Sequence, residues 1–221
     1  MSKLSTTKPI LIMLYGYPGA GKSFFARQLS NTLTTAHLQA DKLRGELFEK
    51  PQYDKQEDEL IDHLMMYMAE EFLKAGMSVI YDTNATRLVQ RRELRNLAIK
   101  AKAESLLVWL QIDSASAQAR LNQRDKRKTD DKYAKTYDAK SFQEYIHKMQ
   151  NPKGEDYIVV SGKHTQKMQS NAVIKKLLDL GLISRMNAGA NVVKPGLVNL
   201  IPHQIRNGRV DESRRDIYIK Q

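Results

Sequence analysis

The stretch GYPGAGKS (residues 16–23) decides the fold, because it fits the pattern GxxxxGK[ST] of a phosphate-binding loop. It follows the apolar run PILIMLY (9–15), which is typical of a buried strand, and it precedes a helical pattern near 22–33. In such a loop, backbone N–H groups and the N-terminus of the next helix face the phosphates. We therefore predict an ATP site with the residues Gly16, Tyr17, Pro18, Gly19, Ala20, Gly21, Lys22, Ser23 and Phe24.

Short β-rich runs alternate with longer helical patterns along the rest of the chain. This alternation predicts an α/β, doubly wound, five-stranded and mostly parallel sheet. The predicted strands are 9–15, 36–40, 77–82, 105–112 and 156–162. The predicted helices lie near 22–33, 54–75, 87–103, 115–126, 141–150 and 168–180.

Length and composition indicate one globular domain with an appendage. The 221 residues contain no cysteine, which excludes disulfides, zinc ribbons and thiolate catalysis. The longest apolar run, ILIML (10–14), is too short to span a bilayer, so we expect a cytoplasmic protein without a membrane partner. We predict a kinase domain over 1–184 and a basic C-terminal extension over 185–221, which either packs on the domain, stays mobile or contacts nucleic acid.

The net charge of +11 favours polyanionic partners. A nucleotide and a nucleic acid both fit this charge, and the charge alone does not choose between them. The histidines are scattered along the chain, which argues against a metal hydrolase. They are His37, His63, His147, His164 and His203.

A magnesium site is predicted beside the phosphate loop. Lys22 is expected to reach the β and γ phosphates, and the Ser23 hydroxyl is expected to ligate Mg²⁺. Mg²⁺ takes only one or two protein ligands, and Asp82 at the end of the strand VIYD supplies a second one, directly or through water. The alternative is that Asp82 only starts a turn with Asn84.

The segment QADKLR (39–44) supplies candidate acceptor-side groups. Asp41 follows the second predicted strand, so it lies at the carboxyl edge of the sheet, where open α/β folds bind ligands. Asp41 is a candidate base for a substrate hydroxyl, and Arg44, one helical turn on, points from the same face at the acceptor. Alternatively, Asp41 is a helix N-cap and Arg44 is solvated.

The basic run RLNQRDKRK (120–128) and the polar segment after it indicate a lid over about 125–140. Arg120 and Arg124 are four residues apart, so we expect them to share a helix face and to stabilise charge on the migrating phosphoryl group. The alternative is a solvated helix end whose cations offset the helix dipole.

The order of these motifs resembles the kinase domain of polynucleotide 5′-hydroxyl kinases. GxPGxGKS is followed by DxxR after the second strand, DTN after the third, and RxxxR before a polar lid. The pattern covers roughly 8–165 and is also similar to the wider group that includes zeta-type toxins and antibiotic phosphotransferases.

This resemblance implies a role for each matching residue. Asp41 would be the general base and Arg44 would bind the phosphate of the acceptor. Asp82 would orient the site, and Arg124 would be the cation of the lid. Lys22 and Ser23 of the phosphate loop would bind the phosphates of ATP and the metal.

We therefore expect an ATP- and Mg²⁺-dependent phosphotransferase that acts on a hydroxyl group, with a nucleic-acid 5′-hydroxyl as the favoured acceptor. One alternative is a small-molecule kinase acting on a nucleotide sugar, a sugar acid or an antibiotic. Another is an ATP-dependent switch or nucleic-acid-binding ATPase that transfers no phosphate.

Overall fold

The computed structural model describes residues 3–124 and 133–183. The predicted lid lies partly outside these ranges, and the predicted extension 185–221 lies wholly outside them. The described part of the lid, from Tyr133 to the start of the next helix at Ala139, has no helix or strand.

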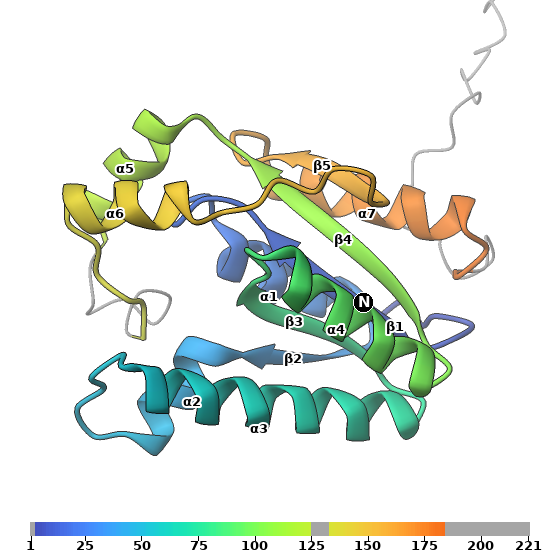
Figure 1. Cartoon of the computed structure of the whole chain (residues 1–221). Helices are drawn as coiled ribbons and strands as arrows, with labels where there is room; N and C mark the ends of the chain where they lie inside the picture. Colours follow the sequence, from blue (N-terminus) through green and yellow to red (C-terminus); the bar gives the residue numbers. More distant parts are fainter. Residues whose placement is uncertain (1–2, 125–132, 184–221) are drawn as a thin grey trace, which may run out of the picture. The chain divides into compact units, whose positions relative to one another are not determined.

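Five strands form one sheet in the order β2-β3-β1-β4-β5, and each pairing between them is parallel. This arrangement confirms the predicted five-stranded α/β fold (Figure 1). The strands are β1 (Ile10–Tyr15), β2 (Thr35–Gln39), β3 (Ser78–Asn84), β4 (Glu104–Gln111) and β5 (Tyr157–Ser161).

Helices cover both faces of the sheet, as the crossover connections of a parallel sheet require. On one face α1 (Lys22–Thr32) contacts α7 (Gln166–Asp179), and on the other α3 (Lys55–Lys74) contacts α4 (Leu88–Lys100) (Figure 1). The remaining helices are α2 (Ala40–Leu47), α5 (Ser114–Asn122) and α6 (Ala139–His147). Within the described ranges, none of the helices is long and apolar enough to cross a membrane.

Strand β1 is fully buried, as its continuous apolar sequence predicts. Its residues Leu11, Met13 and Tyr15 point to the face that holds α3 and α4. There they pack in one cluster with Met65 of α3 and Leu94 of α4. The strand that carries the phosphate loop is therefore fixed by packing on its whole length.

Several element boundaries differ from the predictions by a few residues, including the ends of α4 at Lys100 and α6 at His147. Helix α2 was predicted only as a helix start at QADKLR, but it runs over eight residues. Helix α5, predicted over 115–126, ends at Asn122, because the following QRDKRK run has no apolar side chain to pack a further turn.

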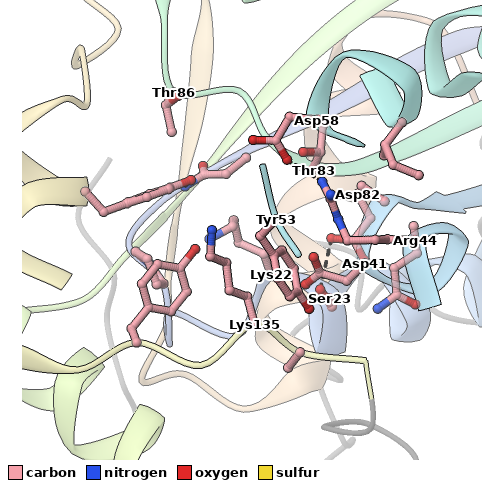
Figure 2. A pocket seen from close by; sticks show the side chains of 18 of the residues that line it. Lys22, Ser23, Asp41, Arg44, Tyr53, Asp58, Asp82, Thr83, Thr86 and Lys135 are labelled. Carbon is pink, nitrogen blue, oxygen red and sulfur yellow. Dashed lines mark hydrogen bonds and ion pairs between the residues drawn. The ribbon is translucent and has the colours of Figure 1, made fainter. Parts of the chain in front are cut away.

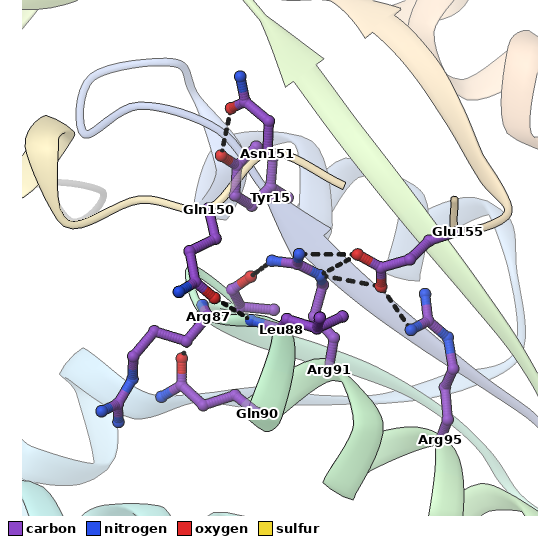
Figure 3. Close-up of polar contacts among 10 residues, drawn as sticks. Tyr15, Arg87, Leu88, Gln90, Arg91, Arg95, Gln150, Asn151 and Glu155 are labelled. Atoms are coloured by element: carbon purple, nitrogen blue, oxygen red, sulfur yellow. Dashed lines mark hydrogen bonds and ion pairs between the residues drawn. The ribbon is translucent and has the colours of Figure 1, made fainter. Parts of the chain in front are cut away.

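A buried ion pair fixes the start of α4 (Figure 3). The fully buried Arg91 donates to the Ala85 carbonyl at 2.8 Å and packs over the Tyr15 ring at 5.4 Å. Its Nε and Nη2 donate to the Glu155 carboxylate at 2.7–3.1 Å, and Arg95 donates to the same carboxylate. This contact ties the loop after β3 to the segment before β5.

Candidate active site

A cavity of about 890 Å³ lies at the carboxyl edge of the sheet (Figure 2). It brings together most of the residues that the sequence singled out. They are Pro18, Gly19, Gly21, Lys22, Ser23, Phe24, Asp41, Arg44, Asp82, Arg120 and Arg124.

The phosphate loop has a backbone that only glycine adopts without strain at key positions. Gly19 and Gly21 have φ of 84° and 92°, and a Cβ at Gly19 would collide with the Ala117 carbonyl oxygen. Tyr17 packs behind the loop on the α5 and α6 cluster, and Ala20 is buried. No side chain caps the first turn of α1, so this helix N-terminus suits a phosphate group.

Lys22 lies folded over the loop. Its Nζ donates to the carbonyl oxygens of Gly16 at 2.9 Å and Tyr17 at 3.0 Å. Burial lowers the pKa of Lys22 to about 8, although the nearby carboxylate of Asp82 opposes this shift. The ammonium is therefore poorly compensated until an anion enters the loop.

The predicted metal ligands are in direct contact. The Ser23 hydroxyl donates to Oδ1 of Asp82 at 3.1 Å, and Asp82 is buried. These hard oxygens fit Mg²⁺, which completes its shell with waters and phosphate oxygens. No group of three or more His, Cys, Asp or Glu side chains in the described part of the chain forms a metal cluster.

His37 was missed by the sequence reasoning. Its Nε2 lies 3.0 Å from Oδ2 of Asp82, so the second carboxylate oxygen is held while the first faces Ser23. This contact depends on the pairing of β2 with β3, in which Gln39 lies beside Asp82. Nothing in the sequence fixes that register, and His37 had been grouped with the scattered histidines.

Asp41 lies in the first turn of α2, because the helix begins at Ala40. The residue at the N-cap position is Gln39, and no side chain caps this helix, so the N-cap alternative for Asp41 is wrong. Burial and the charge of Asp82 raise the pKa of Asp41, while Arg124 and other cations oppose the shift. A raised pKa favours a carboxylate that takes up a proton.

Arg44 is buried rather than solvated, so that alternative is wrong too. Its guanidinium donates to Glu57 at 2.8 Å and also to Asp58. It packs over the Tyr53 ring at 4.9 Å. The role of Arg44 on an acceptor phosphate stays a prediction, because two carboxylates already hold its guanidinium.

Arg120 and Arg124 both line the cavity, but they do not share a helix. Arg120 belongs to α5 and donates to the Gly162 carbonyl at 3.0 Å. Arg124 lies beyond the end of α5 and donates to the Lys135 carbonyl at 3.2 Å. The expectation of one shared helix face is therefore wrong, because the helix ends between them.

Asn84 links the start of the phosphate loop to Tyr145 of α6, a role that the sequence did not suggest. Its side-chain amide donates to the Gly16 carbonyl at 2.8 Å and to the Tyr145 hydroxyl at 3.0 Å. Its Oδ1 accepts from the Gly16 N–H at 3.3 Å. The DTN motif placed Asn84 at the strand end, but Tyr145 is 61 residues away and gave no signal.

Comparisons with known proteins identify the family and the fold. A family model described as an AAA domain matches residues 11–152. No curated protein sequence matches the chain.

Solved structures share the fold at low identity. A sugar kinase from Janibacter is 13% identical, with a TM-score of 0.55 over 85% of this chain and 99% of its own. Kti12 from Chaetomium thermophilum with ADP-AlF3 is 15% identical, with a TM-score of 0.59 over 76% and 97%. The Mycobacterium tuberculosis APS kinase CysC with AMPPNP and APS is 15% identical, with a TM-score of 0.55 over 77% and 98%. At these identities the likeness shows the fold alone.

Proposed function

The chain belongs to the AAA domain family, and we propose that it is a cytoplasmic ATP- and Mg²⁺-dependent phosphotransferase that acts on a nucleic-acid 5′-hydroxyl. One observation carries the proposal. Asp41, a carboxylate with a raised pKa, lines the same cavity as Lys22 and Ser23 of the phosphate loop. A base beside a phosphate loop is what hydroxyl phosphorylation needs and what a nucleotide switch does not need.

Each residue of the cavity has a chemical task in this reaction. Lys22 would bind the β and γ phosphates, and Ser23 and Asp82 would hold Mg²⁺. Asp41 would accept the proton of the attacking hydroxyl. The new bond joins that oxygen to the γ phosphorus, the bond to the β–γ bridging oxygen breaks, and ADP leaves. Arg124 would offset the charge that spreads over the γ-phosphoryl oxygens.

The basic side chains of the cavity support a nucleic-acid acceptor, whereas the net charge of +11 fits a nucleotide equally well. Arg87, Lys135 and Lys148 line the cavity outside the phosphate loop, together with the acidic Asp58, Glu59 and Asp62. The fold neighbours named a sugar kinase and an APS kinase favour the second candidate, a small-molecule kinase. The third candidate, a non-kinase ATPase, has no need for Asp41.

A transfer assay with labelled ATP and Mg²⁺ tests the proposal. The acceptors are 5′-hydroxyl DNA, 5′-hydroxyl RNA, nucleosides, sugars and sugar acids. We expect Asp41→Asn to lower transfer to 5′-hydroxyl ends by about 10²–10⁴-fold while ATP binding is retained. Asp179→Asn, exposed at the end of α7, is the matched control and should leave transfer unchanged.

Three results have different meanings in this assay. If only sugars or sugar acids are labelled, the acceptor is a small molecule and the proposed nucleic-acid acceptor is wrong. If Asp41→Asn transfers phosphate as fast as the wild type, Asp41 is not the general base. Tight ATP binding without any labelled product would refute the kinase and favour the nucleotide switch.

A further inference from the structure

Tyr53 has an unusual backbone conformation next to the cavity. Its φ is 56°, in the left-handed region that residues other than glycine rarely adopt. The carboxylate of Glu57 fixes this turn, because it accepts the N–H groups of Gln52 at 2.7 Å and Tyr53 at 2.8 Å. Strained residues that surrounding contacts hold in place concentrate at ligand sites, so the strain points to a use for Tyr53.

The Tyr53 ring is held as firmly as its backbone. The guanidinium of Arg44 packs on it at 4.9 Å, and the same guanidinium is bonded to Glu57, which fixes the backbone. Burial raises the pKa of Tyr53, and the charge of Asp41 adds to the shift. A rigid aromatic ring therefore lies close to the candidate base in one cavity (Figure 2).

Cations and further aromatic rings share the cavity with Tyr53. The Lys135 ammonium lies 4.8 Å from the Tyr53 ring centre and 5.9 Å from that of Tyr137. Tyr137 packs edge-on against Tyr145, with ring centres 5.5 Å apart. Lys148 lines the same cavity. Aromatic rings with lysine and arginine beside them are the features that bind single-stranded nucleic acid, through base stacking and phosphate contacts.

We infer that Tyr53 is a specificity-determining residue on which the terminal base of a 5′-hydroxyl nucleic acid stacks. The base takes the position beside the ring that the Lys135 ammonium occupies in the free protein, and Lys135 then pairs with a phosphate of the strand. Arg44 positions the Tyr53 ring instead of binding the phosphate of the acceptor. This inference rests on the proposed function, since it names a contact of the same acceptor.

The test combines changes in the protein with a change in the strand. Two 5′-hydroxyl oligonucleotides differ only at the terminal nucleotide, which either carries a base or is abasic. They are phosphorylated by the wild type, Tyr53→Leu and Tyr53→Phe. The matched control is Tyr67→Leu, which removes an exposed tyrosine of α3 that does not line the cavity.

Stacking predicts coupling between the two changes. With the base present, Tyr53→Leu should lower kcat/KM by about 5–150-fold, the range measured for loss of one aromatic platform, and Tyr53→Phe should keep most of it. With the abasic strand, kcat/KM of the wild type should fall by a similar factor. Tyr53→Leu should then lower kcat/KM on that strand only slightly further. Tyr67→Leu should change neither value.

An equal loss by Tyr53→Leu on both strands would overturn the inference, because the ring would then act on the protein's structure alone. Transfer to sugars only would overturn it as well. If no acceptor is labelled, the proposed function is wrong, but the contact between Tyr53 and the base can still be tested. The affinity for the two strands is then measured by fluorescence anisotropy with AMPPNP present. Affinity that depends on the base and on Tyr53 would support the contact, and base-independent affinity would overturn it.

Discussion

ATP binding should take up a proton, because of the position of Lys22. In the free protein this lysine is buried against two backbone carbonyls, and its pKa is about 8. About half of the molecules therefore lack the proton at pH 8, by the ordinary titration curve. Phosphate oxygens within a few ångström favour the charged form, so the complex restores the proton.

The magnitude follows from this pKa. Binding should take up about 0.5 proton at pH 8 and about 0.9 proton at pH 9. Because uptake of a proton on binding makes the association constant fall as pH rises, ATP affinity should drop nearly tenfold per pH unit above pH 9. Phosphate groups titrate near pH 6, so ATP itself contributes little to the uptake in this range.

Calorimetry measures the uptake directly. ATP is titrated at pH 8 in two buffers with different protonation enthalpies, and the difference in observed heat gives the number of protons. Lys22→Arg is the control, because a guanidinium keeps its charge and should bind without uptake. Equal heats in both buffers for the wild type, or the same buffer difference for Lys22→Arg, would refute the reasoning.

Three further predictions concern stability and the metal. Glu155→Ala leaves the buried guanidinium of Arg91 without its carboxylate partner and should lower the free energy of unfolding by about 3–5 kcal/mol, measured by urea denaturation. His37→Leu removes the contact to the second oxygen of Asp82, so Mn²⁺ binding with AMPPNP present, measured by electron paramagnetic resonance, should weaken by about 10–100-fold. Gly19→Ala should lower ATP affinity and the melting temperature together, because its Cβ collides with a carbonyl oxygen of α5.

Each of these variants has a matched control in the chain. Glu71→Ala removes an exposed ion pair and should cost less than about 1 kcal/mol. His63→Leu changes an exposed histidine and should leave Mn²⁺ binding unchanged. Gly76→Ala has a similar φ of 79° but open space around the added Cβ, so it isolates the backbone strain. If a control variant shows the same loss of stability or binding as its test variant, the explanation given for that test variant is wrong.

The Glu155 contribution also has a defined pH dependence. Burial opposes the charge of Glu155, but the bonds from Arg91 and Arg95 outweigh it and lower the pKa below the ordinary 4.5. A carboxylate with a lowered pKa in the folded state stabilises the fold above its unfolded pKa. The stabilisation should therefore be complete above about pH 4.5 and decline as the pH falls through the lower folded-state value.

Local patterns were sufficient to predict the sheet and the proximity of Ser23 to Asp82 in the cavity. The loop between β1 and α1 has a backbone that glycine spacing alone dictates, and Ser23 and Asp82 follow from the strand ends. Their encounter needs only the rule that parallel strands present their carboxyl ends at one edge.

The acceptor side could not be predicted in the same way. Tyr53 lies in a turn whose conformation depends on Glu57, and Arg44 is buried because that carboxylate and Asp58 surround it. His37 meets Asp82 only through the register of β2 against β3. These contacts are tertiary, so neither periodicity nor a motif contains them.

The side-chain amide of Asn84 has a thermodynamic consequence. Its Nδ2 donates both to the Gly16 carbonyl, where the phosphate loop begins, and to the Tyr145 hydroxyl, which lines the cavity, and its Oδ1 accepts from the Gly16 N–H. If the protein is the kinase proposed above, an occupant that shifts one of these partners would alter the bonds available to the other, so the binding of ATP and of the acceptor would be coupled. By reciprocity, the factor by which ATP changed the affinity for the acceptor would equal the factor by which the acceptor changed the affinity for ATP.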